Sequence, residues 1–84
     1  MSRIIVERTF EPPLTEEELR AIEARMAPCL DIYQVRWIRS FWSTDRRRMI
    51  CEYEAADTAS VRNAQREAEA KFDRMWAADI LGEP

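Results

Sequence analysis

Residues 3–10 read RIIVERTF, and their β-branched and aromatic side chains predict a β-strand. Glu7 and Arg8 stand side by side within this strand. Because successive side chains of a strand point to opposite faces of the sheet, the carboxylate and the guanidinium must point to opposite faces too. Which face covers the core therefore decides which of these two charges lies nearer the interior.

A helix follows the two prolines that end the first strand. Thr15 and Glu18 have the spacing of a capping box, in which each side chain accepts a hydrogen bond from the other residue's backbone N–H. Apolar residues then recur every three or four positions, which predicts one buried stripe along the helix. The stripe consists of Leu19, Ile22, Met26 and Leu30.

The middle of the chain predicts a β-hairpin, followed by a second helix and a last strand. Residues 34–42 and 47–54 suit two strands, and the polar residues between them suit a turn. Asp57 or Thr58 caps the second helix, and residues 72–76 suit a short strand. The remaining residues, 79–84, are expected to form a tail.

The element order βαββαβ is that of the ferredoxin-like fold, in the α+β class. We therefore expect a single domain over residues 1–84, with a four-stranded antiparallel sheet and two helices on one of its faces. Ile4 and Val6 supply the apolar floor that the helices need. Arg8 shares their side and is expected at the rim, because it is near the strand end, whereas Glu7 is expected on the open face.

The hairpin can be assigned to the two faces in the same way. A short loop pairs Trp42 with Arg47 and Ser40 with Met49, and the same register pairs Trp37 with Glu52. A slip of one residue in the loop would invert the assignment for the second strand. In the expected register the open face carries Ile5, Glu7, Trp37, Arg39, Phe41, Ile50 and Glu52.

An open sheet face this rich in apolar groups predicts a partner. Monomers seldom expose a large contiguous apolar patch, so we expect a homodimer with two sheets face to face, a dimeric α/β barrel-like assembly. Incompletely filled space between the sheets would form a small-molecule pocket. The expected ligand-binding residues are Glu7, Trp37, Arg39, Phe41, Glu52 and Tyr53.

Composition argues against several other classes of protein. The net charge is −3, from 13 basic and 16 acidic residues, so no nucleic acid is expected as a partner, and Arg46-Arg47-Arg48 is expected to be a solvated cluster. The sequence contains no apolar run long enough to span a membrane and no signal-peptide pattern, so a cytoplasmic location is expected. Cys29 and Cys51 are expected to pack as reduced core thiols.

The residue types that hold metals and phosphates are scarce. There is no histidine, and Gly82 is the only glycine, so neither a typical metal site nor a glycine-rich phosphate loop is expected. We expect no metal and no cofactor. Trp76 is expected to pack at one end of the domain.

Several segments resemble a family of small bacterial proteins of unknown function, one characterised member of which binds nickel. The matching segments are residues 5–10 (IVERTF), 35–40 (VRWIRS), 45–55 (DRRRMICEYEA), 59–62 (ASVR) and 72–74 (FDR). The resemblance implies a ferredoxin-like fold and a homodimer. The chain departs from the family in lacking histidine, and in continuing with helix-forming residues over 67–71, which predicts a longer second helix.

Three functions fit these observations. The first is a dimeric protein that binds a small molecule between the open sheet face and its partner. The second is an enzyme in which Glu7 or Glu52 acts as general acid or base, supported by Tyr53, Ser40 or Arg39, since neighbouring carboxylates push their pKa values apart. The third is a metal-binding protein, which the resemblance favours and the absence of histidine disfavours.

Overall fold

β1 (Ser2–Thr9) lies at the centre of the sheet in a computed structural model that describes residues 1–82. It pairs with β3 (Arg48–Ala55) on one side and with β4 (Arg74–Ala78) on the other, and β2 (Arg36–Trp42) pairs with the outer edge of β3. All three pairings are antiparallel. The predicted βαββαβ order and ferredoxin-like fold are confirmed.

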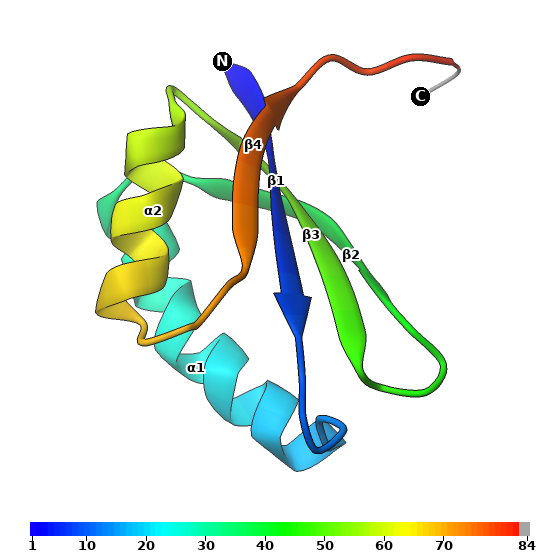
Figure 1. Cartoon of the computed structure of the whole chain (residues 1–84). Helices are drawn as coiled ribbons and strands as arrows, with labels where there is room; N and C mark the ends of the chain where they lie inside the picture. Colours follow the sequence, from blue (N-terminus) through cyan, green and yellow to red (C-terminus); the bar gives the residue numbers. More distant parts are fainter. Residues whose placement is uncertain (83–84) are drawn as a thin grey trace.

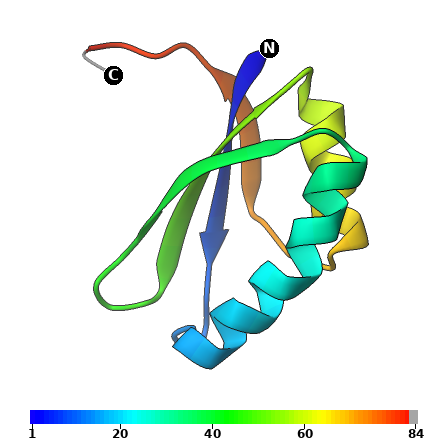
Figure 2. The same ribbon diagram turned by 180° about the vertical axis from the view of Figure 1, so that it is seen from behind.

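α1 (Glu16–Ile32) and α2 (Thr58–Glu67) cover the same face of the sheet, and the opposite face is left open (Figures 1 and 2). Ile4 and Val6 of β1 are completely buried beneath the helices, as their alternation predicted. Val61 and Ala64 of α2 are also completely buried, so the alanine-rich side of this helix packs closely on the sheet. No helix of the described part of the chain is long and apolar enough to cross a membrane.

The start of α1 matches the predicted capping box. The Thr15 side chain accepts a 3.1 Å hydrogen bond from the Glu18 backbone N–H, and the Glu18 carboxylate accepts one of 2.9 Å from the Thr15 backbone N–H. The Thr15 hydroxyl also donates a 2.9 Å hydrogen bond to the Glu18 carboxylate, and the two bonds that this carboxylate accepts lower the pKa of Glu18, the one from the Thr15 backbone most. The first turn thus satisfies N–H groups that would otherwise have no partner.

Both helices end in a Schellman motif without glycine. At the end of α1, the N–H groups of Gln34 and Val35 donate to the carbonyls of Asp31 and Leu30, and Gln34 has a φ of 55°. Glycine normally occupies this left-handed position, because a Cβ atom is strained there. The residues in this position therefore do not predict, from the sequence, where either helix ends.

The prediction of a longer second helix is wrong for the same reason. Glu69 adopts a φ of 56°, and the N–H groups of Glu69 and Ala70 donate to the carbonyls of Arg66 and Gln65. The helix therefore stops at Glu67 although residues 67–71 are good helix formers. β4 then begins two residues later than the predicted strand over 72–76.

The hairpin register differs from the expected one by two residues. Trp42 pairs with Met49, and Ser40 with Cys51, because the loop is longer than expected: the Ser43 N–H donates to the Arg48 carbonyl at 2.9 Å. A shift of two residues leaves each side chain on its expected face. Phe41 therefore remains on the open face, as predicted.

A β-bulge then changes the face assignment at the start of β2. The register shifts between Trp37 and Arg39, so Ile38 has no partner on β3 and Trp37 pairs with Tyr53 instead of Glu52. The extra residue reverses the alternation of side chains before it. The prediction that Trp37 lies on the open face is therefore wrong.

Beyond β4, residues 79–82 form neither helix nor strand, as the expected tail over 79–84 required, and residues 83 and 84 lie outside the described part of the chain. Trp76 does not pack at the end of the domain as expected. It pairs with Ile5 of β1 and lies half-exposed on the open face.

Candidate functional site

The open sheet face combines exposed apolar groups with paired charges. Phe41, Trp76 and Ile50 are 60%, 46% and 37% exposed, which is unusual for side chains of their size in the middle of strands. Glu7 and Glu52 lie among them on β1 and β3. Arg39 of β2 is opposite Glu52, so four of the six expected site residues share this face: Glu7, Arg39, Phe41 and Glu52.

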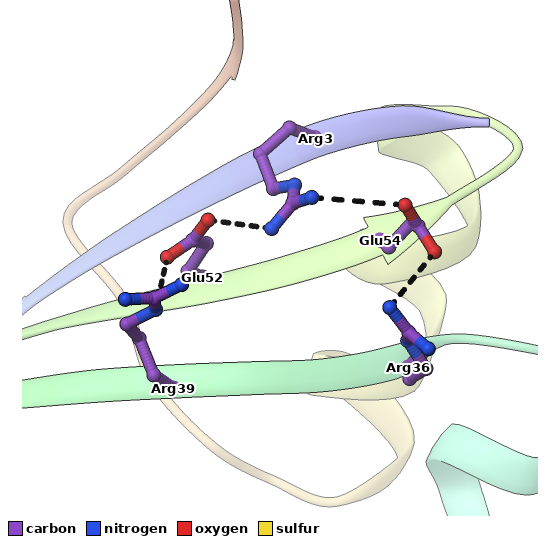
Figure 3. A network of polar contacts seen from close by, with 5 residues as sticks. All are labelled: Arg3, Arg36, Arg39, Glu52 and Glu54. Carbon is purple, nitrogen blue, oxygen red and sulfur yellow. Dashed lines mark hydrogen bonds and ion pairs between the residues drawn. The ribbon is translucent and has the colours of Figure 1, made fainter. Parts of the chain in front are cut away.

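A ladder of alternating charges crosses three strands at one end of this face (Figure 3). Arg3 donates to Glu52 at 2.6 Å, and Arg39 lies 3.0 Å from the other oxygen of the same carboxylate. Arg3 also lies 3.7 Å from Glu54, which Arg36 approaches to 3.4 Å. We call these five residues the charge ladder. Glu52 is held between two guanidinium groups, which satisfies both of its oxygens.

Glu7 lies outside the charge ladder and has partners of its own. Trp76 Nε1 donates a 2.7 Å hydrogen bond to one oxygen of the carboxylate, and Arg74 donates one of 3.1 Å to the other. The Trp76 hydrogen bond is the main reason why the pKa of Glu7 is lowered, and the charge of Arg74 lowers it further. Glu7 is therefore an ionised hydrogen-bond acceptor at neutral pH, and it holds no proton to donate.

A family model for the nickel responsive protein SCO4226-like family matches residues 5–77. The chain belongs to the SCO4226-like family. The crystal structure of SCO4226 from Streptomyces coelicolor A3(2) is similar in fold, with a TM-score of 0.84 over 96% of this chain and 100% of that one, at 11% sequence identity. No curated protein matches the sequence. The resemblance to a small bacterial family found in the sequence is thus confirmed.

The remaining two expected site residues of this SCO4226-like chain lie on the helix side of the sheet. Trp37 donates a 2.9 Å hydrogen bond to Ser40, and both border a cavity beneath α1. Tyr53 is buried in the same region, and its burial raises the pKa of its hydroxyl. The structure therefore separates Trp37 and Tyr53 from the other four residues by the thickness of the sheet.

Arg8 was expected at the rim, and this expectation is wrong. Its side chain is only 5% exposed, because it folds under α2 and donates hydrogen bonds to Gln65, Tyr53 and the Lys71 carbonyl. Alternation within β1 placed Arg8 on the correct face. Its partners come from the second half of the chain, so the sequence near Arg8 gave no sign of them.

The arginine cluster of the hairpin is dispersed. Arg46 stacks on the Trp42 ring with its guanidinium carbon 3.9 Å from the ring centroid, and Arg47 pairs with Glu11 at 3.0 Å. Arg48 begins β3. The three guanidinium groups have different surroundings, so they do not form one phosphate-binding surface.

Metal-binding residue types do not gather anywhere in residues 1–82. No group of three or more His, Cys, Asp or Glu side chains in this part of the chain could hold a metal ion. Cys29 and Cys51 are both buried and free. The polar groups that could contact a ligand in this SCO4226-like chain are therefore the ion-paired carboxylates of the open face and the buried arginine on the helix side.

Proposed function

We propose that this protein is a homodimer that binds a small molecule between two open sheet faces. The observation that carries the proposal is the exposure of Phe41, Ile50 and Trp76 together on a face that no helix covers. A second copy would remove all three from water, and each large apolar side chain stabilises an interface when it is buried.

The charge ladder supports a second copy as the covering partner. Its charges alternate in sign from Arg36 through Glu54, Arg3 and Glu52 to Arg39. A two-fold interface brings the same patch from each subunit together, and this strip is complementary to its copy when the axis passes between two neighbouring charges, so that arginines face carboxylates. Because Glu7, Glu52 and Glu54 of this face already have arginine partners, a covering copy leaves none of the three without a counter-ion.

The ligand is proposed to lie against Glu7, Arg39, Phe41 and Glu52. These residues provide one aromatic surface, one guanidinium and two ionised carboxylates, which suits a molecule with an apolar ring and a few hydrogen-bond donors. Both cysteines are free and buried, which agrees with a reducing compartment, so we propose a cytoplasmic location.

Nickel binding is the alternative that the family description raises, since SCO4226 gives its name to a nickel responsive family. Histidine is the commonest metal ligand in proteins, and this chain contains none. We therefore favour a small organic ligand over nickel. Metal analysis of untagged protein purified from cells, followed by calorimetric titration with nickel, is expected to show no stoichiometric binding.

The oligomeric state tests the first part of the proposal. Sedimentation velocity over a series of concentrations is expected to show a dimer for the wild-type protein and a monomer for Phe41→Lys. Ile32→Lys is the matched control, because Ile32 is an equally exposed apolar residue at the end of α1, away from the open face. A wild-type protein that stays monomeric at high concentration would disprove the proposal.

Native mass spectrometry of protein purified from cells tests the second part. The dimer is expected to carry a small molecule, and Glu52→Gln is expected to lose it while remaining folded. Thr44→Ala, at an exposed site in the hairpin turn, is the control that should retain it. A dimer that carries no mass beyond its two chains would refute ligand binding but not dimerisation.

A further inference from the structure

A cavity of about 420 Å³ lies between α1 and the sheet, on the side opposite the open face. Its walls are almost entirely apolar, and they include Met26, Leu30, Trp37, Trp42 and Met49. Ligand pockets usually have volumes of about 300–1,000 Å³. The exposed residues Glu23 and Ala27 of α1 also border the cavity, so its mouth lies along this helix.

Arg8 borders this apolar cavity, and its guanidinium group has no carboxylate partner within residues 1–82. Its three hydrogen bonds go to neutral acceptors: the Gln65 side chain at 2.6 Å, the Lys71 carbonyl at 2.9 Å and the Tyr53 hydroxyl at 3.3 Å. Arg8 forms no ion pair with any residue from 1 to 82. A buried charge without a counter-ion is costly, so an anion that reached Arg8 would be bound favourably.

Arg8 also has hydrogen-bonding capacity left over. A guanidinium carries five N–H groups, and the three hydrogen bonds within the described chain occupy three of them. A second hollow of about 370 Å³ shares Arg8, Leu19, Ile22 and Met49 with the cavity, so Arg8 borders both spaces.

Two neighbouring polar groups lack an acceptor as well. Trp42 Nε1 is buried at the cavity wall, Gln65 Nε2 belongs to the buried amide that accepts from Arg8, and neither has a hydrogen-bond partner within residues 1–82. The Gln65 amide cannot be turned round, because its oxygen is needed by Arg8, which has no acceptor. Arg8 and Trp42 thus bring N–H groups without acceptors to one apolar cavity, and buried donors normally have partners.

We propose that this cavity binds an apolar carboxylic acid, with the carboxylate on Arg8 and the apolar body against Trp37, Trp42 and Met49. The carboxylate supplies the acceptors and the negative charge that the site lacks. The apolar body matches walls made of aromatic and thioether side chains. This site lies on the other face of the sheet from the proposed dimer contact and does not depend on it.

Binding of decanoate and of decanol tests the proposal, because the two probes share a chain and differ in the head group. Tryptophan fluorescence titration is expected to show decanoate binding at least about tenfold more tightly than decanol, since hydrogen bonds to charged groups are about twice as strong as neutral ones. Equal affinities, or no binding of decanoate, would overturn the proposal.

Variants locate the binding within the cavity. Arg8→Met is expected to bring the affinity for decanoate down to that for decanol, whereas Arg62→Gln, which removes one positive charge from an exposed position of α2, is expected to leave both affinities unchanged. Ala27→Phe fills the mouth from an exposed helical position and is expected to weaken both probes about tenfold or more. If Arg8→Met does not fold, the affinity of Ala27→Phe for decanoate decides. An affinity equal to that of the wild type would place the ligand elsewhere and contradict the proposal.

Discussion

Trp76 Nε1 donates a 2.7 Å hydrogen bond to Glu7 Oε2, across the pairing of β4 with β1. The donor belongs to the last strand and the acceptor to the first, and the bond fixes the carboxylate on the open sheet face. It also holds the pKa of Glu7 below its ordinary value. Glu7 therefore keeps its negative charge to a lower pH than an ordinary glutamate, and its surroundings do not suit proton donation.

Replacing Trp76 with Phe is expected to raise the pKa of Glu7 toward its ordinary value, because the largest cause of the lowering is removed. Glu7 has a lowered pKa in the folded state, so it adds stability above its ordinary pKa of 4.5 that is lost as the pH falls through the folded-state pKa. Trp76→Phe should therefore lose less stability between neutral and acidic pH than the wild type.

Carboxyl-carbon NMR titration measures the pKa of Glu7, and urea denaturation at both pH values measures the stability. Trp37→Phe is the control, since Trp37 lies on the helix side and its hydrogen bond goes to Ser40. An unchanged Glu7 titration in Trp76→Phe would show that the hydrogen bond does not set the pKa.

Thr15→Ala is expected to lower the free energy of unfolding by about 1 kcal/mol, the usual cost of losing an N-cap side chain. The Thr15 hydroxyl is the acceptor for the Glu18 backbone N–H, and alanine leaves this N–H without it. Urea denaturation measures the change. Thr44→Ala, in the exposed hairpin turn, removes the same atoms and should change stability by less than about 0.5 kcal/mol. Equal losses in both variants would argue against the capping box as the cause.

Gln65→Leu is expected to destabilise the protein by about 3 kcal/mol, because it removes an acceptor from the buried Arg8. Gln65→Glu should cost far less, about 1 kcal/mol or nothing, since it gives Arg8 a counter-ion and removes the unpartnered Nε2.

Thermal or urea denaturation compares the two variants directly. Asn63→Leu is the control, because it is a neighbouring amide on α2 that is only partly buried. If Gln65→Glu is as destabilised as Gln65→Leu, a negative charge beside Arg8 does not stabilise the protein, and the prediction is wrong. Gln65→Glu should also weaken decanoate binding, since the anion then competes with a resident carboxylate.

Glu69→Gly is expected to stabilise the protein by about 0.5–1 kcal/mol, because glycine adopts the left-handed conformation at the end of α2 without strain. Arg62→Gly, at an exposed position inside the same helix, should instead destabilise it by about 1 kcal/mol. Denaturation curves of the two variants give both values. Destabilisation by Glu69→Gly would mean that the Glu69 side chain contributes more than its backbone costs.

The fold could be predicted because its main signals are local. The capping box at Thr15, the alternation of Ile4 and Val6 and the polar turn after Trp42 each act within a few residues, and together they specify the βαββαβ order. The helix ends were harder, because the usual C-terminal signal is glycine and this chain places Gln34 and Glu69 there. A left-handed residue of this kind is held by the Schellman hydrogen bonds, which only the folded backbone reveals.

The candidate site could be predicted only in part. Glu7, Arg39, Phe41 and Glu52 reached their expected face because a register error of two residues preserves alternation. Trp37 did not, because a bulge at Ile38 adds one residue without any proline or glycine to mark it. Arg8 was misplaced because its burial depends on Gln65 and on the Lys71 carbonyl, both more than fifty residues away.

The central place of β1 also has a consequence for synthesis. β1 pairs with β3 (residues 48–55) along one edge and with β4 (residues 74–78) along the other. The strand that is synthesised first is therefore the last strand to have both edges paired. A nascent chain that stops short of β4 exposes the whole edge of β1 that β4 pairs with. Ribosome-bound fragments of this protein should therefore acquire protease resistance only once the last strand has left the exit tunnel.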